Sequence, residues 1–427
     1  MISGWLWAFR QFSRQIWVRA SLFSVAAIVT ALVAVVVTPY IPADLPTKIG
    51  SDAVDNILGI IASSMLAVTT FSLSTMVSAY SAATSNVTPR ATKLIMEDTT
   101  TQNVLSTFVG SFLFSLVGII ALSTGLYGDR GRVVLFAVTI LVIIAIVVTL
   151  LRWIDHLSRL GRVTETTERV EAAATSAMQS RRENPYLGGR PLPERGEIPP
   201  SARPVFASYI GYVQHIDTSA LSAIAEEGSG RIYILDIPGA FADPSRPIAL
   251  ADGLGLEDQE ERIRGCFTIG GVRSFDQDPR FGAVVLTEIA SRALSPGIND
   301  PGTAIDVIGR AVRLLAIWGE PLEDEPGVDY PNLFVPPVKV EDLFDDLFTP
   351  IARDGASTIE VGIRLQKAFR SLSRFSRDGY ADNALRHSRE ALERAEIALS
   401  IDGDRARLRS LAHQIEQECL DRAAPPR

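Results

Sequence analysis

The sequence predicts an α-helical membrane domain of four transmembrane helices, followed by a cytoplasmic α+β region with a small β-barrel-like module and a helical C-terminal part. Three observations support this prediction. The long apolar segments all lie early in the chain, a proline- and glycine-rich segment follows them, and short strand-like segments then give way to amphipathic helices. The expected division is a transmembrane domain at 1–153, a helical stalk at 154–182, a linker at 183–203, a β-rich module at 204–255 and a mainly helical cytoplasmic domain at 256–427.

The composition excludes several classes of protein. With 47% hydrophobic residues over 427 positions, the chain is too apolar for an ordinary soluble protein. Its net charge of −8 argues against a nucleic-acid partner, because neutralising phosphates requires a basic surface. The two cysteines, Cys266 and Cys419, lie far apart in the part expected to be cytoplasmic, so no disulfide framework is indicated.

Hydropathy predicts transmembrane spans at about residues 16–40, 57–83, 104–126 and 133–153. The apolar part of the first span, 21–40, is about long enough to cross the hydrocarbon core. It is longer than the apolar part of a typical secretory signal and ends without a small-x-small cleavage site, so we interpret it as a retained anchor.

The distribution of basic residues between the loops predicts the orientation of these spans. They gather before the first span, between the second and third, and after the fourth: Arg10, Arg14, Arg19, Arg90, Lys93, Arg152, Arg159 and Arg162. The other two loops hold only Lys48, Arg130 and Arg132. By the positive-inside rule, both termini are therefore expected in the cytoplasm.

Five polar residues are expected at the membrane interface: Arg90, Lys93, Arg152, Asp155 and His156. Asp155 and His156, just beyond the fourth span, have two interpretations. They form either a solvated interfacial belt or a charge cluster that relays protons.

The second span carries a row of hydroxyl groups along one helical face. At about 100° per residue, the row contains Ser63, Thr70, Ser74, Ser78, Ser81 and Ser85. Small and hydroxyl residues allow close packing of transmembrane helices, which favours a helix-packing seam. Hydroxyls can also replace part of an ion's hydration shell, which favours the lining of a water-filled path. Both interpretations remain open at this point.

After the fourth span, helical character continues to about Arg181, so this span is expected to extend into the cytoplasm as a stalk. Prolines and glycines in 184–204 then end the helix. Strands are expected at 205–216, 231–237 and 247–251, and a short helix is expected to start with Asp217 as its N-cap. The turn at 238–247 resembles that of small hammerhead barrels, but no lysine lies at its tip for cofactor attachment.

Two further helices are expected to begin at Asp278-Pro279 and Asp300-Pro301, because aspartate caps free amides and proline fits the first helical position. The tight joint between them contains Ser295, Pro296, Gly297 and Asn299. The carboxylates of Asp276, Asp278 and Asp300 could instead hold a divalent cation, but capping already accounts for two of them, so no metal is expected. Residues 321–350 suggest an extended excursion, and 351–420 three amphipathic helices.

The sequence carries no recognised motif of catalysis. It lacks a phosphate-binding loop, a dinucleotide glycine pattern, a zinc-protease motif and a nucleophile elbow, and its four histidines are dispersed. We therefore expect no enzyme activity and no cofactor. The centres of spans two to four hold no ionisable residue, which argues against an ion-coupled transporter. Two functions remain, a passive conduit and a non-conducting scaffold. In either case we expect a homo-oligomer in contact with membrane lipids. The scaffold would also bind a cytoplasmic protein.

Several segments together resemble a known family. They are Thr88-Pro-Arg90 with Asp98, Gln102, Leu105, Phe108, Gly110 and Phe112; Gly211-Tyr-Val-Gln-His-Ile-Asp217; Gln277-Asp-Pro279 with Phe281-Gly282; and Ala293-Leu-Ser-Pro-Gly-Ile-Asn-Asp-Pro301. In this order they resemble the bacterial predicted membrane proteins of domain-of-unknown-function family 2254. Val87 and Gly302 depart from the family pattern, which usually has a Phe and an aromatic residue there. The resemblance implies the architecture and a bacterial inner-membrane location, and it implies no activity.

Overall fold

The computed structural model describes residues 51–423, apart from 97, 125–128, 255 and 323–326, together with residues 21, 25, 29 and 33. These residues form two compact units, each of which is described by itself. One contains residues 51–85 and 92–165, and the other contains Asn86–Ala91 and residues 166–423. Helix α4, Pro89–Met96, contributes residues to both units. The predicted first span lies outside the described residues, except for the four helical positions above.

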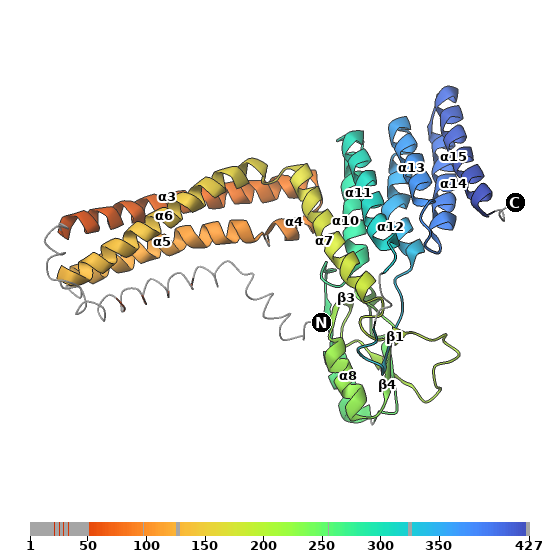
Figure 1. The fold of residues 1–427 in the computed structure, drawn as a ribbon, viewed down its shortest axis with the longest axis horizontal. Coiled ribbons are helices and arrows are strands. Elements are labelled where there is room, and N and C mark those ends of the chain that lie inside the picture. The colour runs from red at the N-terminus through yellow and green to blue at the C-terminus, as the bar shows by residue number, and fades with distance from the viewer. Residues whose placement is uncertain are drawn as a thin grey trace. The chain divides into compact units, whose positions relative to one another are not determined.

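The first unit is built from three long helices that contain the predicted second and fourth spans and, up to Ser123, the third (Figure 1). They are α3 Ser51–Asn86, α5 Thr99–Ser123 and α6 Asp129–Arg159. Each contains a stretch long and apolar enough to cross a membrane: Ala53–Ala82, Thr99–Ser123 and Arg132–Arg159. The chain described here thus has three candidate spans, and a fourth stays a prediction.

Apolar side chains hold these three helices together. Leu58 of α3 packs with Phe114 of α5 and Leu135 of α6. Closer to the other end, Met65, Phe108 and Trp153 belong to a second cluster. Gly118 permits the close approach of α5 to α3, because a Cβ there would lie 3.0 Å from the side chain of Leu58. The buried face of α3 therefore looks toward α5 and α6.

The predicted helical stalk at 154–182 is helical over most of its length but is interrupted near residue 161. Helix α6 ends at Arg159, and α7 begins only at Val163 and runs to Glu183. Gly161 between them has φ +80°, in the region that glycine adopts most easily, and a Cβ there would lie 3.2 Å from Ala79 of α3. The charged residues around Gly161 are compatible with a helix, so the sequence pattern hid the break.

Helix α7 is packed along one side into the second unit, rather than standing as a free stalk. A Cβ on Gly282 of α10, Pro279–Ala293, would collide with Ala174 of α7. Glu171 accepts hydrogen bonds from Arg310 (2.5 Å) and Arg313 (2.6 and 3.0 Å) of α11, Pro301–Gly319. Burial raises the pKa of Glu171, but the hydrogen bonds and charges of both arginines outweigh it and hold the pKa below its ordinary value.

The second unit contains two sheets. The larger has the order β1-β8-β4-β6-β2, with β1 Arg190–Pro191, β8 Leu333–Val335, β4 Arg231–Ile234, β6 Pro247–Asp252 and β2 Arg203–Phe206. Strand β8 runs parallel to both of its neighbours, whereas the other pairs are antiparallel. The smaller sheet has the order β5-β3-β7, with β5 Phe241–Ala242, β3 Gly211–Ile216 and β7 Phe267–Gly270. A barrel-like module is not confirmed, because both sheets have edge strands.

One apolar core serves both sheets and two helices. Val213 of β3, Ile232 of β4 and Ile248 of β6 belong to it, together with residues of α8, Thr218–Glu227, and Ile263 of α9, Leu256–Gly265. Asp217 caps α8 as predicted, since its carboxylate accepts from the amide of Ala220 at 3.0 Å. The expected strand at 205–216 is two strands, β2 and β3, which belong to different sheets.

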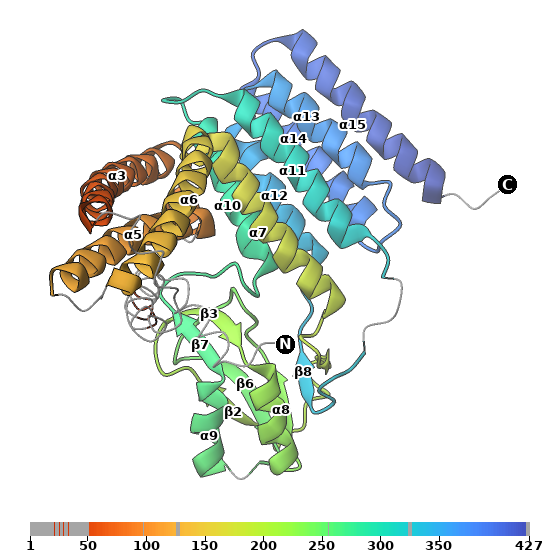
Figure 2. The ribbon, with the colours of Figure 1, turned by 60° about the vertical axis from the view of Figure 1, so that its left-hand side comes forward.

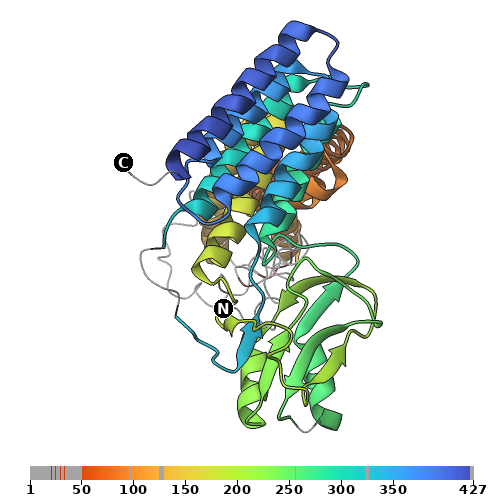
Figure 3. The same ribbon diagram turned by 90° about the vertical axis from the view of Figure 1, so that its right-hand side faces the viewer.

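The helices α10 to α15 lie side by side, and the strands lie beyond one end of them (Figure 2 and Figure 3). They continue after α11 with α12 Val340–Asp354, α13 Ile359–Leu372, α14 Tyr380–Ala398 and α15 Asp402–Ala423. The three predicted amphipathic helices correspond to α13, α14 and α15. The expected extended excursion at 321–350 is wrong in part, because β8 and most of α12 lie within it.

Candidate functional site

The hydroxyl row of α3 lies on the surface of the three-helix packing. Ser63, Thr70, Ser74, Ser78 and Ser81 are exposed in the described part of the chain, while the side chain of Ser85 lies outside it. Large apolar side chains border the row, among them Ile60 and Phe71, with 64% and 65% of their surfaces exposed. The row therefore points away from the side of α3 that packs on α5 and α6.

Several of these hydroxyls are satisfied within α3 itself. Ser63 donates to the carbonyl of Gly59 at 3.0 Å, Thr70 to that of Leu66 at 2.9 Å and Ser78 to that of Ser74 at 3.0 Å. Such bonds to the preceding turn remove the cost of placing a hydroxyl in an apolar environment. The oxygen lone pairs that remain can still accept a bond from a partner helix or face a passing ion.

The turn after α3 is held by a glutamate of α10. Val87 and Thr88 are buried, and the hydroxyl of Thr88 donates to Oε2 of Glu288 at 2.9 Å. Arg90 donates to Oε1 of the same carboxylate at 2.5 Å. All four residues belong to the unit that contains residues 166–423. Sequence analysis placed Arg90 at the membrane interface and did not identify Glu288 as its partner.

The other predicted interface residues divide into two groups. Arg152 and Asp155 are exposed, and Asp155 pairs with Arg159 at 3.3 Å, as expected for a solvated belt. His156 points to the other side, where Nε2 lies 3.0 Å from Oδ2 of Asp98. The side chain of Lys93 lies outside the described residues.

Asp98 and His156 form a mostly buried polar cluster in the first unit. Asp98 is the N-cap of α5, where its carboxylate accepts from the amide of Thr101 at 2.8 Å and from its hydroxyl at 2.6 Å. That hydroxyl also lies 3.1 Å from Nε2 of His156, and the imidazole stacks on Trp153. The capping residue Asp98 therefore connects the start of α5 to His156 at the end of α6. Asp155 is not part of this cluster.

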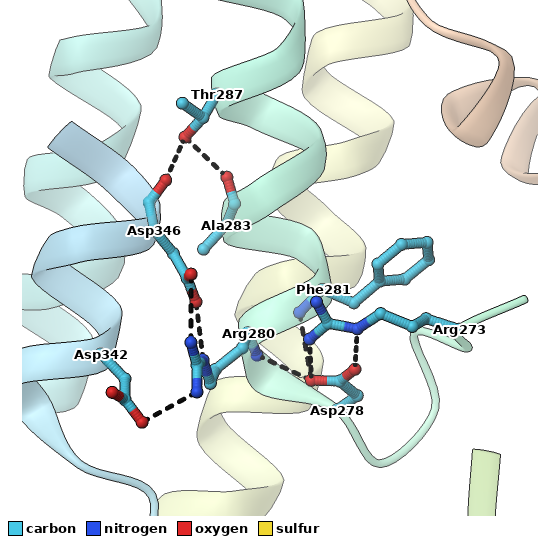
Figure 4. A network of polar contacts seen from close by, with 8 residues as sticks. All are labelled: Arg273, Asp278, Arg280, Phe281, Ala283, Thr287, Asp342 and Asp346. Atoms are coloured by element: carbon cyan, nitrogen blue, oxygen red, sulfur yellow. Dashed lines mark hydrogen bonds and ion pairs between the residues drawn. The ribbon is translucent and has the colours of Figure 1, made fainter. Parts of the chain in front are cut away.

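Asp278 begins α10 within a network of ions (Figure 4). Its carboxylate accepts from the amides of Arg280 and Phe281, each at 3.1 Å, which confirms its predicted role as a cap. It also forms a two-point ion pair with Arg273, at 2.7 and 2.9 Å, and its side chain is only 2% exposed. Arg280, the next arginine along, pairs with Asp342 and Asp346 of α12 at 2.7–3.1 Å.

A second arginine lies near Asp278 from α7. Arg181 is buried and donates to the carbonyl of Gln277 at 3.0 Å. Burial lowers the pKa of its guanidinium to about 10, and the nearby charge of Asp278 opposes that change. The side chain of Gln277 in turn accepts from the amide of Ile216 at 3.0 Å, so the network joins α7, α10 and the smaller sheet.

Asp300 is the matching cap of α11, but it is exposed. It accepts from the amide of Thr303 at 3.1 Å and from its hydroxyl at 2.6 Å. In the joint before it, Ser295 donates to the carbonyl of Arg292, and Asn299 adopts φ +52°. Prolines 279 and 301 occupy the first helical positions, as predicted.

The alternative metal site at Asp276, Asp278 and Asp300 is excluded by distance. Asp278 and Asp300 stand at opposite ends of α10, a helix of 15 residues, which corresponds to about 22 Å at the helical rise. Among the described residues there is no group of three or more His, Cys, Asp and Glu side chains that could hold a metal ion.

Comparison with known proteins shows the family of this chain. Residues 13–371 match the family model described as "Predicted membrane protein (DUF2254)". The chain belongs to this family. Uncharacterized proteins of Mycobacterium bovis and of two strains of Mycobacterium tuberculosis are each 32% identical to it over 122 residues, which is 26% of this chain and 23% of each relative. No solved structure matches the chain.

In this DUF2254 protein, three of the segments that carried the resemblance are structural joints. The Thr-Pro-Arg segment is the turn that contacts Glu288, the Gln-Asp-Pro segment starts α10 within the ionic network, and the Ser-Pro-Gly-Ile-Asn-Asp-Pro segment connects α10 to α11. Each fixes where one helix begins relative to another. The resemblance therefore rests on residues that determine the fold, in agreement with the match to a family of predicted membrane proteins.

A cavity of about 740 Å³ opens beside Glu288 in this DUF2254 protein. It is lined from α10, α12 and α14, and its charged side chains include Glu288, Asp346, Arg353 and Arg386. Arg386 donates to Asp345 at 2.7 Å and Arg353 pairs with Asp354 at 2.6 Å, so both of these arginines already have partners. Sequence analysis missed this cavity because its walls come from three helices that are separated along the chain, with lining residues from Val284 to Glu390.

Proposed function

We propose that this protein is an oligomeric channel-like conduit in the inner membrane of a bacterium, in which α3 lines a passive path for ions or small solutes. The observation that carries the proposal is the outward position of the hydroxyl row on α3. A row of hydroxyls on the face that does not pack on α5 and α6 suits an axis shared by several copies of the chain. The second unit would regulate that path.

A non-conducting scaffold is the second candidate, and a specific observation favours it. The hydroxyls of Ser63, Thr70 and Ser78 bond within their own helix, which also suits a packing seam between copies. In that case the second unit would recruit a cytoplasmic protein. We do not propose an enzyme, because the sequence carries no recognised catalytic motif.

Ion flux separates the conduit from the scaffold. Purified protein in liposomes should pass a tracer ion or current, and Ser74→Leu with Ser78→Leu should abolish this flux by placing branched apolar side chains in the hydroxyl row. Ser64→Leu is the matched control, because Ser64 is an exposed serine of α3 outside the row. Its flux should equal that of the natural protein.

Light scattering on the same samples decides how a loss of flux is interpreted. The conduit requires that the double variant keeps the oligomeric mass of the natural protein. Silence of the natural protein under voltage, stretch and pH changes, or loss of flux only because the oligomer dissociates, would leave the scaffold as the better explanation.

We also propose that both termini lie in the cytoplasm, on the basis of the basic residues that flank the spans. In a background without the natural cysteines, an impermeant thiol reagent added to intact cells should label Gly128→Cys and leave Ser180→Cys unlabelled. Ser180 lies on the exposed side of α7, so a lack of labelling there reports the compartment and not burial. Labelling at position 180 would reverse the orientation.

A further inference from the structure

The turn at Asn86–Ala91 has an unusual place in the chain. It begins with Asn86, the last residue of α3, and ends in the first turn of α4. The other described residues of α3 belong to the first unit, yet Asn86–Ala91 is part of the compact unit of residues 166–423. Val87, Thr88 and Ala91 are buried. The chain therefore passes from a candidate membrane helix directly into a six-residue segment that belongs to the fold of the second unit.

One carboxylate makes two side-chain contacts with this turn. Glu288 uses its two oxygens separately, Oε2 for the hydroxyl of Thr88 and Oε1 for the guanidinium of Arg90. A carboxylate that accepts two donors at separate oxygens fixes the turn in both position and direction. Asp or Gln at position 288 would lose reach or charge, so the contact is specific to glutamate.

The same contact is accessible enough to be reversible. The side chains of Arg90 and Glu288 are 58% and 29% exposed, so water can replace either partner. Ion pairs of this exposure contribute little to overall stability, which distinguishes this contact from the buried pairs of Asp278. Glu288 also lines the 740 Å³ cavity, whose lining residues come from α10, α12 and α14.

We propose that Glu288 is a reversible latch that holds the turn after α3 on helix α10. When the latch is engaged, Thr88 and Arg90 are fixed and α3 ends in a rigid anchor. When it is released, the turn and the last residues of α3 become free to move. The latch itself does not depend on the proposed function. Its consequence does, because we propose that the latch regulates the path along α3.

Hydrogen exchange of the full-length protein in detergent tests the latch without reference to transport. In Glu288→Ala, the backbone amides of residues 86–92 should exchange roughly tenfold faster than in the natural protein, because the contact that restrains them is gone. Glu390→Ala is the matched control, since Glu390 lines the same cavity and forms its ion pairs with Arg386 and Arg394 of its own helix. Its exchange in residues 86–92 should be unchanged.

The partners of Glu288 extend this test. Thr88→Val and Arg90→Gln should each accelerate exchange of the turn by less than Glu288→Ala, and combining either with Glu288→Ala should add nothing. The pair Arg90→Glu with Glu288→Arg should restore slow exchange in part. Equal exchange in Glu288→Ala, Glu390→Ala and the natural protein would overturn the latch.

Flux through liposomes tests the regulatory consequence. If the natural protein conducts, Glu288→Ala should change its flux several-fold and Glu390→Ala should not. A freed turn with unchanged flux would overturn regulation by the latch. A natural protein that does not conduct would count against the proposed function, and the exchange experiment would then decide the latch alone.

Discussion

Replacing Asp278 by alanine is expected to lower the free energy of unfolding by about 3–5 kcal/mol, because the buried guanidinium of Arg181 and the partly buried guanidinium of Arg273 lose their counter-charge. Arg273 would lose a two-point ion pair, and Arg181 would lose the charge of Asp278, which raises its pKa against the effect of burial. The amides of Arg280 and Phe281 would also lose their acceptor. The melting temperature of the full-length protein in detergent measures the loss.

Asp300→Ala is the matched control for this prediction. Asp300 has the same role as a cap before Pro301, but it is exposed and pairs with no arginine in the described structure. Its loss should therefore cost only about 1 kcal/mol. Asp278→Asn, which keeps an amide acceptor but removes the charge, should fall between the two. Equal losses for both alanine variants would show that capping alone explains Asp278.

The stability of the protein is expected to fall by roughly 3 kcal/mol as pH decreases from about 6.5 to about 4, because of one buried histidine. His387 of α14 is surrounded by Phe344, Phe348 and Phe369. Burial lowers its pKa to about 4; Arg386 acts in the same direction, while Asp345 opposes it. Below pH 6.5 the unfolded chain binds a proton at this position and the folded chain does not, so acid favours unfolding.

Melting temperatures at pH 7, 6 and 5 check this expectation. His387→Gln should be less steeply destabilised by acid than the natural protein, because glutamine does not titrate. His413→Gln serves as the control, since His413 is 68% exposed and should leave the acid dependence unchanged. An identical pH slope in all three proteins would contradict the role of His387.

Local signals made much of the fold predictable. Asp217, Asp278 and Asp300 were identified as caps because a cap acts on amides two or three residues away, and all three have that role. Hydropathy located α3, α5 and α6 because crossing a membrane requires a continuous apolar length. The hydroxyl row followed from helical periodicity, and its outward position could not be known before the packing partners of α3 were placed.

The remaining features depend on contacts between distant parts of the chain. Thr88 and Glu288 are 200 residues apart, and Asp98 and His156 are 58 apart, so no local pattern links them. Helix α12 was obscured by Pro350 in its last turns and by the acidic residues that pair with Arg280. The break at Gly161 depends on a backbone angle rather than on a change in polarity.

The place of the Asn86–Ala91 turn has a practical consequence for dividing this protein into fragments. A soluble fragment that begins at residue 166 would contain every strand described here and α10 to α15, but it would lack Val87, Thr88 and Ala91, which are buried in the complete chain. It would also leave Glu288 without Thr88 and Arg90. A fragment intended for crystallisation should therefore carry the six residues of the turn, joined by a short glycine-rich linker ahead of α7.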